Sequence, residues 1–351
     1  MNRKKKAGIL AVAVVLLALL AARYQNKNEM VRYTATFLDV FDTKTDVVGY
    51  ATGEEEFTAQ VELLKEKLVY YNQLYDIYHN YEGINNIKTI NDNAGIAPIV
   101  VDREIIGLLQ FSKDMYEQTQ GQTNIAMGSV LSIWHDYREA GVNSPLDAKL
   151  PPMDELENAS AHMDIGDIII DEEASTVYLS DPEMSLDVGS IGKGYAVQRV
   201  AEYAREIGME NVLLSVGGNV CAVGEKQKGT AWRLGIQNPD LSSEEAYVKK
   251  VDVRDACVVT SGNYQRYYTV DGVRYCHIID PDTLMPADYF ASVSIITADS
   301  GMADALSTSL YNMPFDEGLA FVNGMDGVEA MWIFGDGSIR YSESFEQYVA
   351  Q

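Results

Sequence analysis

Residues 186–195 read LDVGSIGKGY, a glycine-rich segment at the start of a predicted helix. The helix is expected over residues 192–207, because apolar residues recur on one face and Gly208 follows the last turn. Backbone N–H groups at such a helix start, together with the helix dipole, bind phosphate. The segment is not a Walker A loop, which has four residues between its first glycine and Gly-Lys and a serine or threonine after the lysine. Taken alone, it is equally compatible with a plain tight turn.

A second polar segment, residues 297–308, reads TADSGMADALST and lies at the start of another predicted helix, over residues 302–312. Asp304, Ser307 and Thr308 stand at positions i, i+3 and i+4, so their oxygens share one helical face. A carboxylate and two hydroxyls form the beginning of a site for a hard cation. Without context, the pattern favours an exposed polar face with a hydroxyl bonded back to the helix.

A third pair of segments brackets a predicted hairpin. Residues 260–264 read TSGNY, and residues 277–281 read HIIDP. Between them, two strand-like stretches flank the turn Asp271-Gly272, a strong two-residue hairpin signal. His277 is one of four histidines, and a histidine at a strand end is more often structural than catalytic. Its neighbour Asp280 is placed to orient or charge it, as a general base requires.

The remaining chain predicts an α+β domain. An apolar stripe that steps by three and four from Phe57 to Tyr78 predicts a long helix, and residues 104–119 predict a second one. Residues 47–52, 292–297, 331–334 and 338–341 are strand-like. Helices and hairpins interleave without regular βαβ alternation, and no linker divides residues 29–351. We therefore expect one domain of mixed or antiparallel sheets with packed helices.

The amino terminus has a different composition. Four basic residues precede a run of sixteen apolar residues, 7–22, which would span about 24 Å as a helix. Leu19 or Leu20 would occupy the −3 position of a signal-peptide cleavage site, where a small residue is needed. We expect an uncleaved membrane anchor over residues 1–28, with the basic tip in the cytoplasm and the domain outside. A buried core helix is the less favoured alternative.

Composition excludes two classes of protein. The 351 residues carry a formal net charge of −25, which excludes a general nucleic-acid binder because such a protein needs a basic face. Hydrophobic residues make up 47% and include 22 tyrosines, which excludes a disordered chain. Three cysteines indicate no disulfide framework. Cys257 and Cys276 are able to pair across a hairpin in an oxidising compartment, but three scattered core thiols are favoured.

Taken in order, these segments resemble the ApbE family, the FAD:protein FMN transferases. The family pattern D-x-G-G-I-A-K-G-Y-A matches residues 187–196, and further matches cover nearly everything after residue 30. The other matching segments are residues 124–134, 217–219, 260–264, 277–281 and 303–308. The chain departs from the pattern where Ser190 replaces a glycine, Gly192 replaces an alanine, and Gln198 stands where an acidic residue is common. Ser190 adds an oxygen that suits a metal ligand, whereas Gln198 puts any role for an acid there in doubt.

The resemblance implies a T-fold-related catalytic domain that binds FAD with Mg²⁺, moves the FMN half onto a threonine or serine of another protein, and releases AMP. An oxygen-rich metal site also accepts Mn²⁺. Carried over residue by residue, the implied metal ligands are Ser190, Asp304, Ser307 and Thr308. The implied FAD-binding residues are Tyr78, Ala126, Met127, Gly128, Asp187, Lys193 and Ile278. Asp304 and His277 are the implied catalytic residues, with His277 taking the proton from the acceptor hydroxyl.

With a membrane anchor, the implied acceptors are extracytoplasmic flavoprotein domains that carry a threonine- or serine-containing sequence. Three alternatives stay open. An FAD pyrophosphatase would use the same metal site with water as the nucleophile and yield FMN and AMP. A non-catalytic surface FAD-binding protein would need no metal ligands. A structural or adhesin-like role would leave the polar clusters unexplained.

Overall fold

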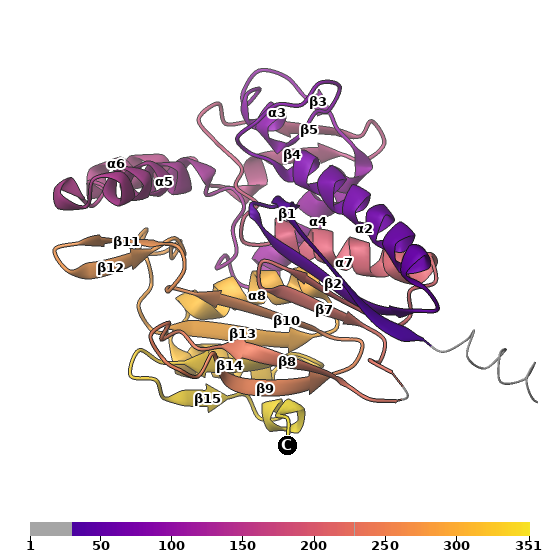
Figure 1. Ribbon diagram of the computed structural model, residues 1–351. Coiled ribbons are helices and arrows are strands. Elements are labelled where there is room, and N and C mark those ends of the chain that lie inside the picture. Colours follow the sequence, from indigo (N-terminus) through magenta and orange to yellow (C-terminus); the bar gives the residue numbers. More distant parts are fainter. Residues whose placement is uncertain (1–29, 228) are drawn as a thin grey trace, which may run out of the picture.

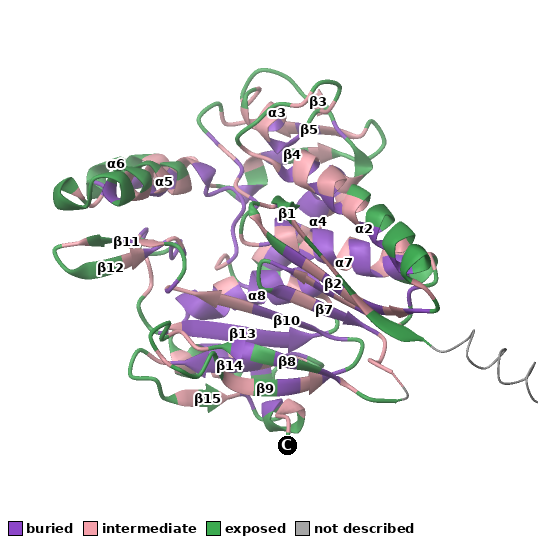
Figure 2. Ribbon diagram, viewed as in Figure 1, coloured by how far each residue is buried: buried purple, intermediate pink, exposed green. Residues whose placement is uncertain are grey.

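The centre of the computed structural model is an antiparallel sheet of eight strands (Figure 1). The structure describes residues 30–351 apart from residue 228. In spatial order the strands are β1 (Val31–Val40), β2 (Thr43–Ala51), β6 (Val212–Val216), β7 (Asn219–Val223), β10 (Cys257–Gly262), β13 (Ser292–Thr297), β14 (Glu329–Ile333) and β15 (Ile339–Tyr341). Every residue of β13 is buried, because both faces of the sheet are covered at its centre (Figure 2).

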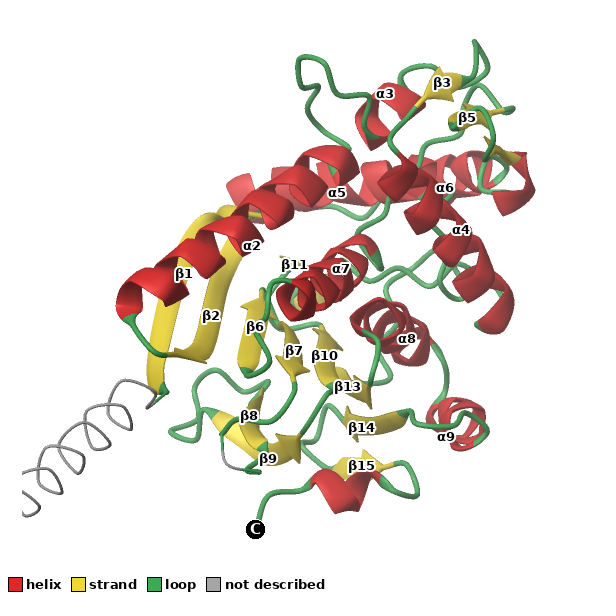
Figure 3. Cartoon of the chain, turned by 90° about the vertical axis from the view of Figure 1, so that its right-hand side faces the viewer, coloured by secondary structure: helices red, strands yellow, loops and turns green. Residues whose placement is uncertain are grey.

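Helices cover one face of the sheet (Figure 3). These helices are α2 (Glu54–Tyr75), α7 (Gly192–Glu206), α8 (Ser300–Asn312) and α9 (Phe315–Asn323), and α4 (Arg103–Gln118) packs beside α2. The opposite face packs against a hairpin of β8 (Trp232–Gln237) and β9 (Tyr247–Val253). Helix α8 is the most enclosed of these elements, since eleven of its thirteen residues are buried.

A separate lobe packs around its own small core beyond the end of the sheet (Figure 1). It contains α5 (Gly128–Asn143), α6 (Met153–Ser160) and a hairpin of β11 (Tyr267–Val270) and β12 (Val273–Cys276). Trp134 lies in this core and donates a hydrogen bond from Nε1 to the Leu284 carbonyl at 2.9 Å. A three-stranded sheet of β3 (Ile99–Val100), β5 (Thr176–Leu179) and β4 (Ile168–Asp171), with α3 (Ile87–Asn91), completes the molecule.

The predicted α+β architecture is confirmed: the sheets are antiparallel and the helices interleave with hairpins. Helix α7 begins at Gly192 as predicted, and Gly208 adopts the positive φ of 84° that ends it. The placement of Tyr78 on the long helix is wrong. Helix α2 ends at Tyr75, because Asp76 adopts an extended backbone and its carboxylate accepts hydrogen bonds from the N–H groups of the next loop.

The favoured prediction of three unpaired thiols is also wrong. Cys221 on β7 and Cys257 on β10 form a disulfide, because the antiparallel register places the two residues directly opposite one another. The alternative pairing of Cys257 with Cys276 does not form, since Cys276 lies on β12 in a different sheet. Cys276 is buried, and its thiol is unpaired within the described part of the chain.

The predicted anchor over residues 1–28 lies outside the described residues. Of the helices between residues 30 and 351, none has the length and apolar character needed to span a bilayer.

Candidate active site

A cavity of about 1350 Å³ opens between the end of the main sheet and the lobe of α5, β11 and β12. It exceeds the 300–1,000 Å³ or so typical of small-molecule pockets, so it accommodates a ligand as large as a dinucleotide. Ten of the predicted site residues line it: Tyr78, Met127, Gly128, Asp187, Ser190, Lys193, His277, Ile278, Asp304 and Thr308. Ala126 and Ser307 are not among the described residues that line the cavity.

Asp304 lies where α7 and α8 cross. The residue is 6% exposed, and its Oδ2 accepts a hydrogen bond of 2.7 Å from the backbone N–H of Gly194. A Cβ on Gly194 would come within 2.3 Å of the Ser300 carbonyl oxygen and 2.4 Å of the Asp304 Cβ. The last glycine of the central motif therefore lets the start of α7 approach α8 closely enough to hold the carboxylate.

The Asp304 carboxyl group is buried, and its pKa is raised overall. Burial raises the pKa of Asp304, whereas the Lys193 ammonium, the Gly194 N–H and the Asn219 side chain act in the opposite direction. No cluster of three acidic, histidine or cysteine side chains that could hold a metal occurs among the described residues. An ion here would rely on Asp304 together with hydroxyl, backbone and ligand oxygens. Because carboxylate and hydroxyl oxygens are the ligands that Mg²⁺ prefers, the residues present fit this ion.

The hydroxyl groups near Asp304 are hydrogen-bonded to one another. Ser307 Oγ donates to the Asp304 carbonyl at 2.9 Å and lies 2.7 Å from Ser261 Oγ on β10. Ser261 Oγ lies 3.4 Å from Thr308 Oγ1. Ser261 and Thr308 line the cavity, whereas Ser307 is fully buried behind them. A direct contact between Ser307 and an ion therefore stays a prediction; in the structure its hydroxyl faces Ser261.

His277 follows β12 and reaches the cavity from the side of the lobe. Its backbone N–H donates to the Arg266 carbonyl at 3.1 Å. Burial, reinforced by the charges of Arg266, Arg138 and Lys193, lowers the pKa of His277 to about 3. The imidazole is therefore neutral at physiological pH, and a neutral imidazole has one ring nitrogen able to accept a hydrogen bond from a ligand hydroxyl.

The predicted interaction of Asp280 with His277 is wrong. The Asp280 carboxylate accepts from the backbone N–H of Asp282 and the hydroxyl of Thr283, so it shapes its own turn. The buried Nδ1 of His277 has no hydrogen-bond partner among the residues that the structure describes. The position of His277 is set instead by its backbone hydrogen bond to Arg266 and by the side chains packed around it.

Two backbone segments form the wall opposite α8. The Gly128 N–H donates to the Ser185 carbonyl at 2.9 Å, and the Asp187 N–H donates to the Ile125 carbonyl at 2.8 Å. A Cβ on Gly128 would lie 2.3 Å from that Ser185 oxygen, so the close pairing requires glycine. Burial raises the pKa of Asp187, which lines the cavity beyond this contact. Ala126 lies behind the wall and supports it, with its N–H bonded to the side chain of Asn124.

Tyr78 stands at the rim with 56% of its surface exposed, and its ring centroid lies 5.6 Å from that of His135. Asp76 holds this loop, because its carboxylate accepts from the N–H groups of Tyr78 and His79 and from the hydroxyl of Tyr81. An exposed aromatic ring on a fixed loop offers a stacking surface for a planar ligand.

Sequence reasoning missed two cationic residues, Arg138 and Arg266, that line the cavity near His277. Each is a single arginine outside a recognisable pattern, so no local signal marked it. Gln198, where an acid is common, has a clear role: its Oε1 accepts from the Ser300 N–H and caps the start of α8.

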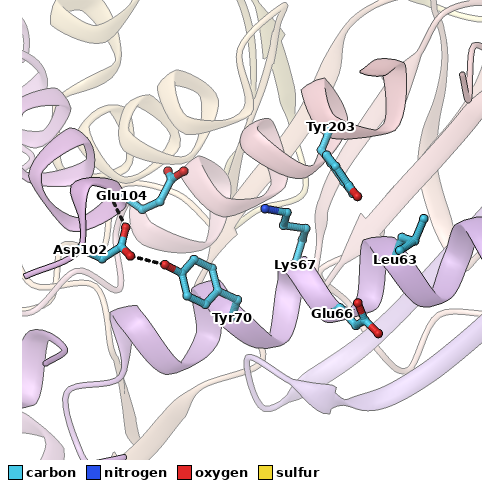
Figure 4. A pocket seen from close by; sticks show the side chains of 7 residues that line it. All are labelled: Leu63, Glu66, Lys67, Tyr70, Asp102, Glu104 and Tyr203. Atoms are coloured by element: carbon cyan, nitrogen blue, oxygen red, sulfur yellow. Dashed lines mark hydrogen bonds between the residues drawn. The ribbon is translucent and has the colours of Figure 1, made fainter. Parts of the chain in front are cut away.

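A second, shallow pocket of about 370 Å³ lies on the outer surface between α2, α7 and the start of α4 (Figure 4). Tyr70 donates its hydroxyl hydrogen to Asp102 there, and the Lys67 ammonium lies over the ring of Tyr203 at 5.1 Å. None of the predicted site residues lines this pocket within the described chain, so we assign the chemistry to the larger cavity.

Comparisons with known proteins show the family to which the chain belongs. The model of the ApbE family matches residues 41–332. The chain belongs to the ApbE family. A similar protein from Treponema pallidum, named FAD:protein FMN transferase, is 33% identical over 266 residues, which cover 73% of this chain and 72% of the relative. Another FAD:protein FMN transferase, from Klebsiella pneumoniae, is 30% identical over 250 residues, which cover 71% of this chain and 75% of the relative.

Solved ApbE structures have the same fold. The ApbE protein from Thermotoga maritima is 26% identical and superposes with a TM-score of 0.80, covering 92% of this chain and all of that one. The flavin transferase ApbE from Vibrio cholerae is 22% identical and superposes with a TM-score of 0.74. The match covers 91% of this chain and 99% of that one. Membership in the ApbE family makes this chain an enzyme of the transferase class.

Proposed function

We propose that this chain is a Mg²⁺-dependent FAD:protein FMN transferase. In this reaction, the oxygen of an acceptor threonine or serine forms a bond to the phosphorus of the FMN half of FAD. The bond from that phosphorus to the oxygen bridging to AMP breaks, AMP leaves with its oxygen, and the hydroxyl proton passes to a base. The observation that carries the proposal is the meeting of Asp304, Lys193 and His277 in one dinucleotide-sized cavity of an ApbE chain.

Each part of the cavity has a place in this reaction. Ser190, Asp304 and Thr308 would hold Mg²⁺, which supplies positive charge to the diphosphate when bound. Lys193 adds a second positive charge beside the same phosphates. Tyr78 provides the surface on which the isoalloxazine stacks, and the neutral His277 accepts the proton of the attacking hydroxyl.

Mass spectrometry of an acceptor flavoprotein domain after incubation with the enzyme, FAD and Mg²⁺ tests the reaction. We expect a covalent FMN adduct, with one AMP released for each adduct. Asp304→Ala is expected to abolish transfer and His277→Ala to reduce it strongly. A wild-type rate for His277→Ala, with Asp304→Ala inactive, would place the base elsewhere.

The same mixture without acceptor distinguishes transfer from hydrolysis. A transferase releases AMP much more slowly when the acceptor hydroxyl is missing. AMP release at an equal turnover without acceptor would identify an FAD pyrophosphatase instead. FAD binding that is tight, unaffected by a chelator and without any AMP release would identify a binding protein.

The location of the enzyme is part of the proposal. Residues 1–28 would anchor it in the cell membrane, with the catalytic domain outside the cytoplasm and facing extracytoplasmic flavoprotein acceptors. The disulfide between Cys221 and Cys257 supports this location, because disulfides persist mainly in oxidising compartments.

A further inference from the structure

The direction of the hydrogen bonds around Ser307 follows from the donors available. A serine hydroxyl has one hydrogen to donate and two lone pairs to accept with. The backbone carbonyl of Asp304 can only accept, so Ser307 Oγ donates its single hydrogen to that carbonyl at 2.9 Å. Ser307 Oγ is then an acceptor toward Ser261 Oγ, which lies 2.7 Å away. The Ser261 hydrogen is thereby directed to Ser307, away from the cavity.

The same reasoning extends to Thr308. Because the hydrogen of Ser261 is directed to Ser307, the contact of 3.4 Å between Ser261 Oγ and Thr308 Oγ1 leaves Thr308 as the donor. The chain of donation runs from Thr308 to Ser261, then to Ser307, and ends at the Asp304 carbonyl. Ser261 and Thr308 both line the cavity. If their hydrogens are committed in this way, the oxygen lone pairs are what they can offer to a cation in the cavity. Lone pairs bind a cation, whereas a hydroxyl hydrogen repels one.

We propose that Ser261 is a positioning residue of the active site, whose hydroxyl, held by Ser307, orients the Thr308 hydroxyl so that its oxygen faces the bound divalent ion. This inference rests on the proposed function, since it concerns the ion that the transferase would use. It explains why a fully buried serine on α8 faces a serine on β10, where apolar packing would otherwise be expected. It also gives Ser307 a role through Ser261 without contact with the ion.

The test measures the binding of Mn²⁺ to the full chain in the presence of FAD, by the electron paramagnetic resonance signal of free Mn²⁺. Ser261→Ala removes the middle of the chain of donation, and Ser307→Ala removes its buried end. Both variants are expected to raise the dissociation constant of Mn²⁺ about 10- to 100-fold, the range found when partners of metal ligands are removed. Thermal unfolding without metal verifies that both variants are folded.

Ser294→Ala is the matched control. Ser294 is a fully buried serine on β13, and its hydroxyl lies 2.7 Å from that of Thr260. Thr260 precedes Ser261 on β10, so the pair lies on the opposite face of the sheet from α8. Removing this hydroxyl takes away a comparable buried hydrogen bond without touching the chain of donation. The dissociation constant of Mn²⁺ is expected to stay within about twofold of wild type, well below the change expected above.

A second measurement distinguishes a positioning role of Ser261 from a general loss of activity in the variant. In Ser261→Ala, the Mn²⁺ concentration that gives half-maximal transfer is expected to rise, while the rate at saturating Mn²⁺ returns close to wild type. A lower rate at all Mn²⁺ concentrations, with unchanged Mn²⁺ affinity, would overturn the inference.

Asp304→Ala distinguishes failure of this inference from failure of the proposed function. If Asp304→Ala loses Mn²⁺ while both serine variants bind it like wild type, the chain of donation is unimportant and the inference is wrong. If wild type binds no Mn²⁺, or Asp304→Ala binds it equally well, the metal site of the proposed function is itself wrong.

Discussion

Gly194 is the residue through which the central motif contacts α8. It has no side chain, so its N–H reaches the Asp304 carboxylate, and α7 lies directly against the start of α8. A single methyl group at this position has no free space. The glycine is therefore required by the contact between two helices, and phosphate binding is not needed to explain it.

We predict that Gly194→Ala lowers the free energy of unfolding by about 1–3 kcal/mol, the usual cost of overpacking a filled site. It should also lower the transfer rate about 100-fold or more, since displacing a catalytic group by 1 Å has an effect of that size. Chemical denaturation and FMN transfer measure the two effects. Gly335→Ala is the control, because no heavy atom of the described residues lies within 4 Å of its added Cβ. A wild-type rate for Gly194→Ala would contradict this account.

The pKa of His277 gives a prediction on pH dependence. Burial and the charges of Arg266, Arg138 and Lys193 lower this pKa to about 3 in the free enzyme, so the imidazole is already neutral above that pH. The pH profile of kcat/KM reports the free enzyme, and between pH 5 and 8 it should show no acid limb from His277. Arg138→Gln removes a positive charge, so the pKa of His277 should rise and its acid limb should move to higher pH. An acid limb that moves to lower pH in Arg138→Gln would contradict this assignment.

Sequence reasoning could group those site residues whose neighbours in space are also neighbours in the chain. Asp304 and Thr308 lie one turn apart on a helix, so their shared face follows from helical periodicity. The position of Ser307 behind Ser261 depends on the contact between α8 and β10, which no local pattern contains. The error for Asp280 has the opposite cause. Asp280 lies three residues after His277 in the sequence, yet the two side chains do not interact.

At the scale of elements, the wall that carries residues 125–128 is supported from behind by an ion pair. His162, just after α6, lies 2.7 Å from Asp181, in the loop that leads to the central motif. The Asn124 side chain donates to the Met163 carbonyl at 3.0 Å, so the two loops and the wall are joined. The hydrogen bond to Asp181 raises the pKa of His162. Despite the cost of burial, hydrogen bonds from Glu183 and His162 lower the pKa of Asp181.

The stabilisation by this pair should therefore depend on pH. The contribution of His162 is fully present below its ordinary pKa of 6.5 and is lost as the pH rises through its raised value. The contribution of Asp181 is present above its ordinary value of 3.8 and is lost as the pH falls through its lowered value. Denaturation of wild type and His162→Gln should differ by about 0.5 kcal/mol near pH 5, since the pair is partly screened by solvent. An equal difference at pH 9 would show that the charge of His162 is not involved.

The disulfide joins β7 to β10 across a separation of 36 residues. Closing a loop of this length restricts the unfolded chain, so Cys221→Ala should lower the free energy of unfolding by about 2–4 kcal/mol relative to oxidised wild type. Denaturation with and without reductant measures the effect. The control is reduced wild type, which should be nearly as stable as reduced Cys221→Ala. Equal stability of oxidised and reduced wild type would show that the disulfide does not form in solution.

The prediction of helices succeeded where the apolar periodicity extends over many residues. The prediction of the cysteine pairing failed, because that pairing depends on which strands are neighbours and on their register. The stripe from Phe57 to Tyr75 is buried on α2 as expected, whereas Tyr78 continues the spacing in a loop. The pairing of Cys221 with Cys257 depends on which strands are neighbours in the sheet. That order places β10 between β7 and β13, an arrangement that sequence spacing alone does not reveal.

At the scale of the whole molecule, the net charge of −25 contrasts with the cationic groups gathered at the cavity. Lys193, Arg138 and Arg266 come from three segments, which only the complete fold brings together. The part of the cavity near His277 therefore carries three cationic groups, which suit an anionic ligand. Sequence reasoning identified Lys193 within its motif, but it could not place the two arginines beside His277.

We predict that a chain beginning at residue 29 transfers FMN to a soluble acceptor domain within about twofold of the full-length rate, because every described residue that lines the cavity lies after residue 40. The full-length protein should sediment with membranes, whereas the shortened chain should stay in the supernatant. Fractionation followed by the transfer assay measures both properties. Sedimentation of the shortened chain with membranes would locate the attachment elsewhere.

The position of α8 in the chain, after the strands that it covers, has a consequence for folding. Helix α8 follows β7, β10 and β13, and it fills the space between these strands and α7. Until α8 has been translated, the apolar surfaces that it covers on the strands and on α7 have no partner. A product that ends before Ser300 would expose these surfaces and would also lack Asp304.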